Sequence, residues 1–195
     1  MSRTYEECLP GFAWQQVADE LGHRTGDPLN IGWYCSDRIC QQGKAAKTAL
    51  LWEDFRGEKR TYSFDDLRQL TNTFAQYLEE LDVKPGERVC LFMDRAPELY
   101  LGFLGVLKMG GIVQPLFSAF GEDSLWTRLD NAGACTVVTQ KKHVRKVRKI
   151  IDRLPNLRHV VVVDADPAKP LKERETALDL HTLPRIDEYT VHATT

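Results

Sequence analysis

The sequence lacks the features that mark several large classes of protein. No apolar run among its 195 residues approaches 18 residues, which excludes a membrane-spanning helix. The first residues, MSRTYEECLPGFAW, carry early acids and no apolar core, so they do not form a secretory signal. The net charge of -2 argues against a chain built mainly to hold nucleic acid or an anionic membrane. We therefore expect a cytoplasmic protein that binds neither nucleic acid nor membrane.

Signatures of metal binding and nucleophilic catalysis are also missing. Five cysteines are an odd number without zinc-ligand spacing, so we expect reduced thiols and no metal site. None of the five serines lies in G-x-S-x-G, and the scattered histidines form no H-E-x-x-H. After Gly133 the sequence contains no glycine, which excludes a Gly-rich phosphate loop from the C-terminal third. We expect no catalytic residue in this chain.

The first half of the sequence contains signals for two helices and a hairpin. Residues 12–21 place apolar side chains on one face of a short helix. The pattern of residues 48–64 predicts two strands joined by a turn at 56–58. Ser63, with Asp66 three residues later, is typical of a helix N-cap, and the apolar spacing continues that helix to about Leu81.

Strands and helices alternate regularly from residue 88 onward. The expected strands are 88–93, 112–117, 135–139 and 159–163, and the expected helices are 97–109, 122–131 and 142–154. This alternation predicts crossover units and a largely parallel sheet. Pro115 cannot donate to a ladder, so the strand 112–117 is short or lies at an edge. The polar residues after Asp164 predict a loop with room for one short helix.

The predicted fold is therefore α/β, with a largely parallel sheet and crossover helices, preceded by an N-terminal helix and a β-hairpin. We divide the chain into an N-terminal cap segment, 1–47, an α/β unit, 48–163, and a loop-rich tail, 164–195.

Basic residues are concentrated in the predicted helix KKHVRKVRKIIDR, residues 141–153. Several of its like charges are four residues apart, and the two lysines that open it oppose the helix dipole. A bound anion would offset this repulsion, and Arg145 and Arg148, three residues apart, suit a phosphate. A solvated basic face explains the same pattern, and both interpretations stay open.

An Asp-x-Asp pair, Asp164 and Asp166, follows the last predicted strand. Such a pair can hold a divalent metal between phosphate oxygens, as in haloacid-dehalogenase-like phosphatases. That motif opens a domain, whereas here few residues follow, so a polar loop is the better interpretation.

Three stretches follow one another along the chain: ALLWED (49–54), RTYSFDDL (60–67) and LDVKPGERVCLFMDRAPELYLGFLGVLKMGGIVQPLFSAF (81–120). In this order and spacing they resemble the N-terminal region of AMP-forming acyl-CoA synthetases. Within that superfamily, LNIGWYCSDR (29–38) and PLFSAFGEDSLWTRLDNAGACTVVT (115–139) are similar to the acetyl-CoA synthetase branch. The resemblance covers about residues 29–163 and implies a partial N-terminal subdomain of a larger adenylate-forming domain.

The resemblance implies coupling of a carboxylate to ATP, with Mg²⁺, and transfer of the acyl group to coenzyme A. The family's phosphate loop, adenine and ribose contacts and catalytic lysine would lie beyond residue 195. The chain would then be roughly the first third of an acetyl- or short-chain acyl-CoA synthetase, inactive alone and binding no substrate tightly. Its partner would be the remainder of that enzyme.

Two elements of the family's coenzyme A site fall inside the chain. Val144-Arg145-Lys146-Val147-Arg148 matches a Val-Arg-x-x-Arg stretch whose arginines contact the nucleotide end of coenzyme A in the family. Phe117 and Ser118 align with a Phe-Gly-Gly-Phe turn near the same ligand, with Ser118 and Ala119 in place of its glycines. The alternatives to a synthetase fragment are a non-catalytic binding or interaction module and an Asp-based phosphatase-like fold.

Overall fold

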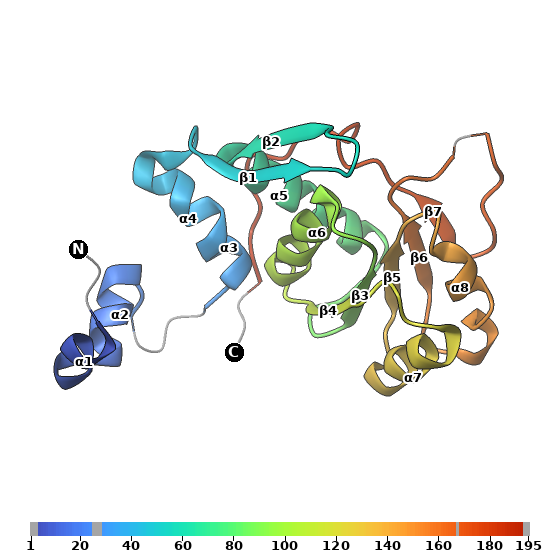
Figure 1. Cartoon of the computed structure of the whole chain (residues 1–195), viewed down its shortest axis with the longest axis horizontal. Helices are drawn as coiled ribbons and strands as arrows, with labels where there is room; N and C mark the ends of the chain where they lie inside the picture. The colour runs from blue at the N-terminus through green and yellow to red at the C-terminus, as the bar shows by residue number, and fades with distance from the viewer. Residues whose placement is uncertain (1–3, 25–28, 167, 193–195) are drawn as a thin grey trace. The chain divides into compact units, whose positions relative to one another are not determined.

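The computed structural model describes residues 4–24, 29–166 and 168–192 (Figure 1). These residues divide into an N-terminal unit that ends at Leu29 and a compact unit from Asn30 to His192. None of the helices in the described ranges combines the length and the apolar character that a membrane crossing requires. The four cysteines whose side chains are described, Cys35, Cys40, Cys90 and Cys135, are free thiols.

The N-terminal unit contains three short helical elements. They are α1 (Tyr5–Cys8), a 3-10 turn (Leu9–Gly11) and α2 (Trp14–Leu21). Thr4 and Glu7 form a reciprocal capping box at α1, and Gly22 ends α2 in the left-handed conformation. The structure thus confirms most of the helix predicted over 12–21, starting two residues later, at Trp14.

The segment after Asn30 forms helices that the sequence pattern did not predict. They are α3 (Ile31–Cys35), α4 (Asp37–Ile39) and a π-type turn (Cys40–Lys44). Asn30 caps α3 through the Trp33 N–H, and its side-chain amide donates to the Leu107 carbonyl at 2.8 Å. Elements of three to five residues are too short to show an apolar periodicity, which explains why the sequence pattern missed them.

A buried lysine joins these short helices to the rest of the unit. The Lys108 side chain is fully buried and forms an ion pair with Asp37 at 2.5 Å. It also donates to the Asn72 side chain at 2.6 Å. Burial lowers the pKa of Lys108, and the charge of Asp37 opposes that shift. Removing either partner would leave a buried charge uncompensated, so this pair fixes the docking of α4.

The β-hairpin and the helix after it follow the sequence prediction closely. β1 (Thr48–Glu53) pairs antiparallel with β2 (Lys59–Ser63). α5 (Phe64–Glu80) then starts at a capping box, in which Ser63 accepts from the Asp66 N–H and Asp66 accepts from the Ser63 N–H. Its apolar stripe, including Leu70, Phe74 and Leu78, is completely buried.

The main sheet has five parallel strands in the order β4-β3-β5-β6-β7 (Figure 1). The strands are β3 (Arg88–Phe92), β4 (Ile112–Leu116), β5 (Thr136–Thr139), β6 (His159–Val162) and β7 (Glu175–Ala177). The connecting helices are α6 (Pro97–Lys108), α7 (Glu122–Ala132) and α8 (Val144–Arg148). The predicted α/β class with a parallel sheet is therefore confirmed. β4, which contains Pro115, is an edge strand as expected.

Helices cover both faces of this sheet. On β3, Val89 and Leu91 join a core that contains residues of α5 and α6. Cys90 and Phe92 belong to a second core, with residues of α7 and α8. Successive side chains of a strand point to opposite faces, so one short apolar strand contributes to both cores.

The chain after residue 150 corrects two predictions. The helix expected over 142–154 is limited to α8, followed by a 3-10 turn (Ile151–Arg153). The segment after Asp164 was predicted to be a loop, but it contains a last parallel strand, β7. β7 has three residues, two of them polar, so neither its length nor its composition signals a strand.

The C-terminal segment packs against the core as well. Leu178 and Leu180 are buried, and Thr73 and Asn72 of α5 donate to the carbonyls of Pro184 and Ile186. The compact unit therefore includes residues on both sides of 48–163. The division into a cap, an α/β unit and a tail stays a prediction.

Gly32 offers a direct test of the contact between α3 and α6. A Cβ atom at this position would lie 2.6 Å from the Leu104 carbonyl oxygen and 2.8 Å from Lys108 Cγ. We expect Gly32→Ala to lower the free energy of unfolding by about 1–3 kcal/mol, because the helix must move away from backbone atoms. Gly11→Ala meets no atom within 4 Å and is the control. Equal denaturation midpoints for the two variants would contradict the close approach.

Candidate functional site

The connections after β3 and β5 leave the sheet on opposite faces. The first leads to α6, in the core with α5, and the second to α8, in the core with α7. In open parallel sheets, ligands bind at such a switch point, outside the carboxyl ends of the strands. A cavity of about 770 Å³ lies there, lined by the loops after β3, β4 and β5 and by the end of β1.

Asp94 is the polar centre of this edge. Its carboxylate accepts from His143 Nε2 at 2.8 Å and pairs with Lys142, and its backbone N–H donates to Gln140 at 2.9 Å. Hydrogen bonds from Lys142 and then Ser118 hold the pKa of Asp94 well below its usual value. The carboxylate therefore stays ionised and joins three loops.

These contacts do not assemble a catalytic triad. In a triad the serine hydroxyl bonds to the imidazole, and the carboxylate orients the imidazole from behind. Here the Ser118 and His143 side chains both bond to Asp94. The cluster therefore has no activated nucleophile and serves to position the loops.

Phe117 and Ser118 line the 770 Å³ cavity. The Phe117 ring is 66% exposed and packs edge-on against Phe120 with ring centroids 5.7 Å apart. Lys146 donates to the carbonyls of Ser118 and Phe120 at 3.0 and 2.9 Å. The structure thus places the turn 117–120 beside α8, which carries Arg145 and Arg148.

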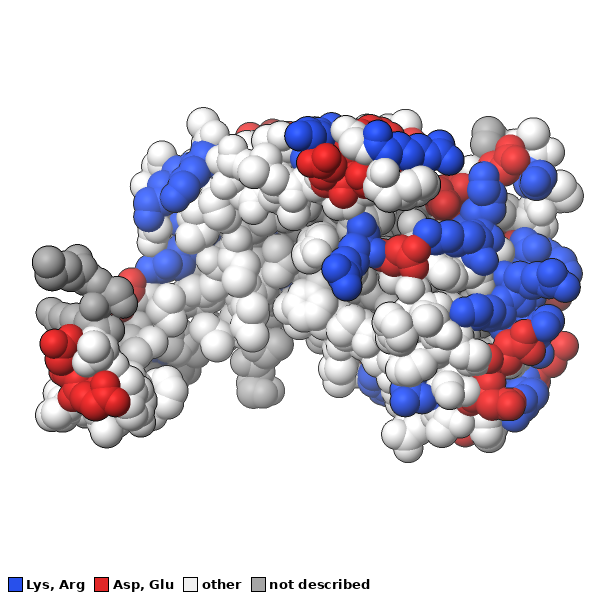
Figure 2. Space-filling view, viewed as in Figure 1, with Lys and Arg blue, Asp and Glu red and all other residues white. Residues whose placement is uncertain are grey.

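Most of the basic residues in 141–153 have partners. The side-chain ion pairs are Lys142 with Asp94, Arg148 with Glu175, Lys149 with Glu122, and Arg153 with Asp123. In Figure 2, acidic side chains lie beside the lysines and arginines at the end of the molecule with α7 and α8. The repulsion that the sequence predicts among the basic side chains of 141–153 is therefore offset by acidic side chains from other elements.

Arg145 and Arg148 differ in their surroundings. Arg148 donates to both oxygens of Glu175, at 2.6 and 2.8 Å, and lines a cavity of about 370 Å³ with Lys141 and Lys169. Arg145 is exposed, and its side chain has no polar partner among the described residues. Both residues stay predicted contacts of coenzyme A.

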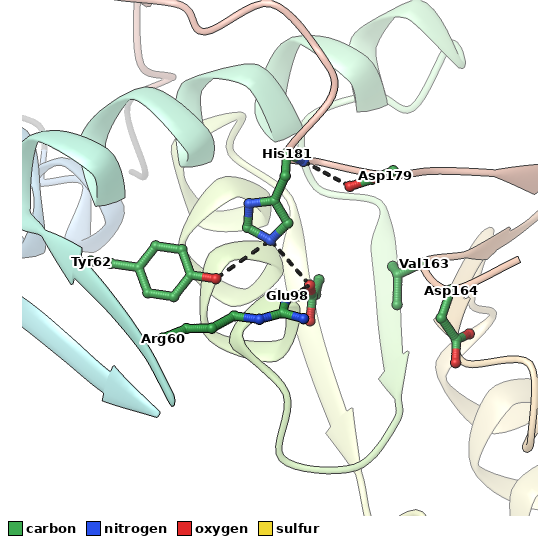
Figure 3. Close-up of a pocket in the computed structure, with 7 residues that line it drawn as sticks. All are labelled: Arg60, Tyr62, Glu98, Val163, Asp164, Asp179 and His181. Atoms are coloured by element: carbon green, nitrogen blue, oxygen red, sulfur yellow. Dashed lines mark hydrogen bonds and ion pairs between the residues drawn. The ribbon is translucent and has the colours of Figure 1, made fainter. Parts of the chain in front are cut away.

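A second polar pocket, of about 460 Å³, lies between β2, α6 and the segment after β7 (Figure 3). His181 Nε2 lies 3.4 Å from the Tyr62 hydroxyl and 3.3 Å from the Glu98 carboxylate. Arg60 reaches the same carboxylate at 3.7 Å. Burial is the largest single influence and acts to raise the pKa of Glu98, but the hydrogen bonds from His181 and a backbone N–H, together with the charges of His181 and Arg60, outweigh it and the pKa is lowered.

The side chains of Asp164 and Asp166 accept hydrogen bonds from backbone N–H groups. Asp164 accepts from the Lys141 N–H, and Asp166 accepts from the Ala168 N–H at 3.1 Å and lies 3.7 Å from the Lys169 ammonium. Among the residues described, no three acidic, histidine or cysteine side chains gather as a metal ion requires. The two aspartates thus have roles in the turns that follow β6.

Sequence reasoning missed the residues that organise these sites. Asp94, Glu98 and Glu175 are single acids in unrelated stretches, and the side chains that bond to them, those of His143, His181 and Arg148, lie 27 to 83 residues away in the chain. No local spacing signals such pairs. Only the position of Asp94 after a buried strand could have singled it out, because strand ends carry ligand-binding loops.

The family is decided by a match over most of the compact unit. Residues 37–190 match the family model described as "AMP-binding enzyme". The chain belongs to this family. It is 31% identical to the acetyl-coenzyme A synthetase of Bacillus subtilis over 98% of the chain and 35% of that protein. It is 33% identical to the 3-hydroxypropionyl-coenzyme A synthetase of Sulfurisphaera tokodaii over 78% of the chain and 25% of that protein.

The fold is shared with a solved member of the same class. The acyl-CoA synthetase of Brucella canis superposes on 99% of the chain with a TM-score of 0.82 at 23% identity. This similarity confirms the α/β fold of an AMP-binding enzyme. The chain spans about a quarter to a third of the length of these relatives, and it corresponds to an N-terminal part of an adenylate-forming enzyme, as the resemblance implied.

The Glu98 cluster predicts a pH dependence of stability. A carboxylate with a lowered pKa contributes stability above its unfolded pKa, near 4.3, and loses it as the pH falls through its folded pKa. We expect Glu98→Gln to lower the free energy of unfolding by about 1 kcal/mol or more at pH 7.

The difference from the wild type should begin to shrink near pH 4 and close only as the pH falls through the lowered folded pKa of Glu98, where the folded protein takes up the proton. Chemical denaturation at pH 7 and at a pH below about 4 measures this difference in the free energy of unfolding. The control is Glu53→Gln, which removes one charge from an exposed ion pair with Lys59. It should change the free energy of unfolding little. A pH-independent difference for Glu98→Gln would contradict the charge assignment.

The two aspartates after β6 give a second test. We expect Asp164→Asn with Asp166→Asn to shift the melting temperature by no more than about 2–4 °C, since an amide oxygen also accepts from an N–H. Millimolar Mg²⁺ should stabilise neither protein. Stabilisation of the wild type by Mg²⁺, lost in the double variant, would support the phosphatase-like alternative.

Proposed function

We propose that the chain is the N-terminal part of an AMP-forming acetyl- or short-chain acyl-CoA synthetase. The observation that carries this proposal is the 31% identity with an acetyl-coenzyme A synthetase over 98% of the chain. The whole enzyme couples a carboxylate to ATP, releases pyrophosphate, and passes the acyl group from the adenylate to the thiol of coenzyme A. Its substrates are the carboxylate, ATP and coenzyme A, with Mg²⁺ on the triphosphate, and its location is the cytoplasm.

The geometry suits a supporting role in this reaction. The described part of the chain presents a cavity at the sheet edge, an exposed aromatic ring at Phe117 and a basic segment at α8. It holds no phosphate-binding glycine loop in its last third, because the sequence has no glycine after Gly133. We assign it the side of the coenzyme A site that holds the nucleotide end, through Arg145, Arg148, Phe117 and Ser118.

A stand-alone binding or interaction module is the alternative from another class. The exposed rings of Phe55 and Phe117 beside one cavity are the observation in its favour. In a synthetase the remaining part of the enzyme covers such a surface. In a module it binds a separate partner.

The synthetase proposal predicts that the 195 residues alone make no acyl-adenylate, because the family's phosphate loop, which would hold the triphosphate for in-line attack, is expected outside them. The test is pyrophosphate release with ATP, Mg²⁺ and acetate. The chain alone should match a heat-treated control, whereas the chain fused in frame to the remaining two thirds of a relative should show acetate-dependent release.

Turnover by the chain alone would contradict the expectation that the chain holds no catalytic residue. A folded fusion that forms neither acyl-adenylate nor acyl-CoA with acetate, propionate or 3-hydroxypropionate would contradict the proposed function.

A further inference from the structure

The turn that follows β4 is held to the rest of the unit from two sides. On one side the Ser118 hydroxyl donates to Asp94, which also bonds to the loop after β5. On the other side Lys146 Nζ donates to the carbonyls of Ser118 and Phe120 at 3.0 and 2.9 Å. Within the turn, the Phe120 N–H donates to the Phe117 carbonyl at 3.0 Å. The backbone of the turn is therefore fixed by contacts outside and inside it.

Lys146 differs from the exposed lysines of its segment in what compensates its charge. Lys149, for example, is exposed and forms an ion pair with Glu122. The half-buried Lys146 ammonium instead bonds to two neutral carbonyls and lies 5.5 Å from the centroid of the Phe92 ring. Removing an ammonium from water costs free energy, which only well-placed acceptors offset. The lysine and the turn therefore hold each other in place.

The fixed turn presents one aromatic ring to the cavity at the sheet edge. Phe117 is 66% exposed and lines the cavity of about 770 Å³. Ser118 and Ala119, which stand where the family's turn has glycines, further restrict the backbone beside this ring. A ring on a fixed backbone binds a ligand at a lower entropic cost than a ring on a mobile turn. A residue that fixes the turn thus affects binding without touching the ligand.

We propose that Lys146 is a positioning residue, which holds the turn against α8 and so sets the place of the Phe117 ring in the coenzyme A site. The proposal rests on the proposed function, because coenzyme A is a substrate of that function. Lys146 acts through Phe117 and makes no contact with a phosphate group. It couples two parts of the site, the turn and α8, that the motifs in the sequence present as separate.

The first experiment needs no ligand and uses the 195-residue chain. Amide hydrogen exchange, followed by NMR, compares the Phe120 N–H in the turn with the Leu125 N–H in α7. Lys146→Met removes the ammonium and keeps an unbranched stem. We expect the Phe120 N–H to exchange about ten-fold faster, and the Leu125 N–H to stay within about two-fold of the wild type, because only the turn is released. Lys149→Met, which removes the same charge from an exposed ion pair, should change neither.

Two outcomes of this experiment would overturn the hold of Lys146 on the turn. One is unchanged exchange of the Phe120 N–H, and the other is equal acceleration at Phe120 and Leu125, which indicates global destabilisation. Lys146→Arg keeps the charge and several donors, so it should recover much of the protection. If Lys146→Met does not fold, Lys146→Gln is measured in its place and judged by the same two outcomes.

The second experiment uses the chain fused in frame to the remaining two thirds of a relative. Lys146→Met should raise the KM for coenzyme A by about five-fold and leave acyl-adenylate formation unchanged. Phe117→Ala should raise the same KM. The double variant should stay within about two-fold of Phe117→Ala alone, since Lys146 acts through that ring. Lys149→Met should stay within about two-fold of the wild type.

Dephospho-coenzyme A, which lacks the 3′-phosphate, separates positioning from a phosphate contact. The effect of Lys146→Met on KM should be as large with this substrate as with coenzyme A. An effect confined to coenzyme A would overturn the proposal, because it would mean that the ammonium binds the phosphate directly. Additive effects of Lys146→Met and Phe117→Ala would also overturn it.

The two experiments separate this proposal from the proposed function. If no folded fusion forms acyl-CoA, the role of the turn in binding coenzyme A is overturned together with the proposed function. The exchange of the Phe120 N–H then still decides whether Lys146 holds the turn.

Discussion

Burial of β3 on both faces is the constraint on which the rest of the unit depends. Val89, Cys90, Leu91 and Phe92 are all completely buried, and full burial of each large apolar side chain contributes about 1.5–3 kcal/mol. A strand covered on both sides requires helices on both sides, which right-handed parallel crossovers provide. The crossovers bring the carboxyl ends of β3, β4 and β5 to one edge. The site at that edge is therefore a consequence of how the core is covered.

Hydrogen bonds and ion pairs of two carboxylates then hold together the segments that the crossovers bring close. Asp94 joins the loops after β3, β4 and β5, and Glu175 joins α8 to β7. The sequence interpretation assigned the compensation of the basic segment to a bound anion or to water. The structure assigns most of it to acids elsewhere in the chain. Like charges that would oppose an isolated helix are tolerated because the fold surrounds them with partners.

The sequence predicted the elements that are specified by a local pattern of apolar or capping residues. The alternation of apolar strands and helices predicted the parallel sheet, and Ser63 with Asp66 predicted the start of α5. It did not predict the helices after Asn30 or strand β7, because these elements have three to five residues and are held by distant contacts. The roles of Asp94, Glu98 and Glu175 were hidden for the same reason. Pairing across the fold leaves no spacing in the sequence.

The same reasoning limits how the chain can hold a highly charged ligand. Coenzyme A carries its phosphates at the nucleotide end, and the described basic segment offers two unpaired cations, Lys141 and Arg145. Two partly solvated contacts give only modest, salt-sensitive affinity. Tight binding then requires further donors and apolar contact, for which the cavity with Phe55 and Phe117 provides one side. Under the proposed function, a chain that spans about a third of the length of such a relative would orient the nucleotide end, and the rest of the enzyme would perform the chemistry.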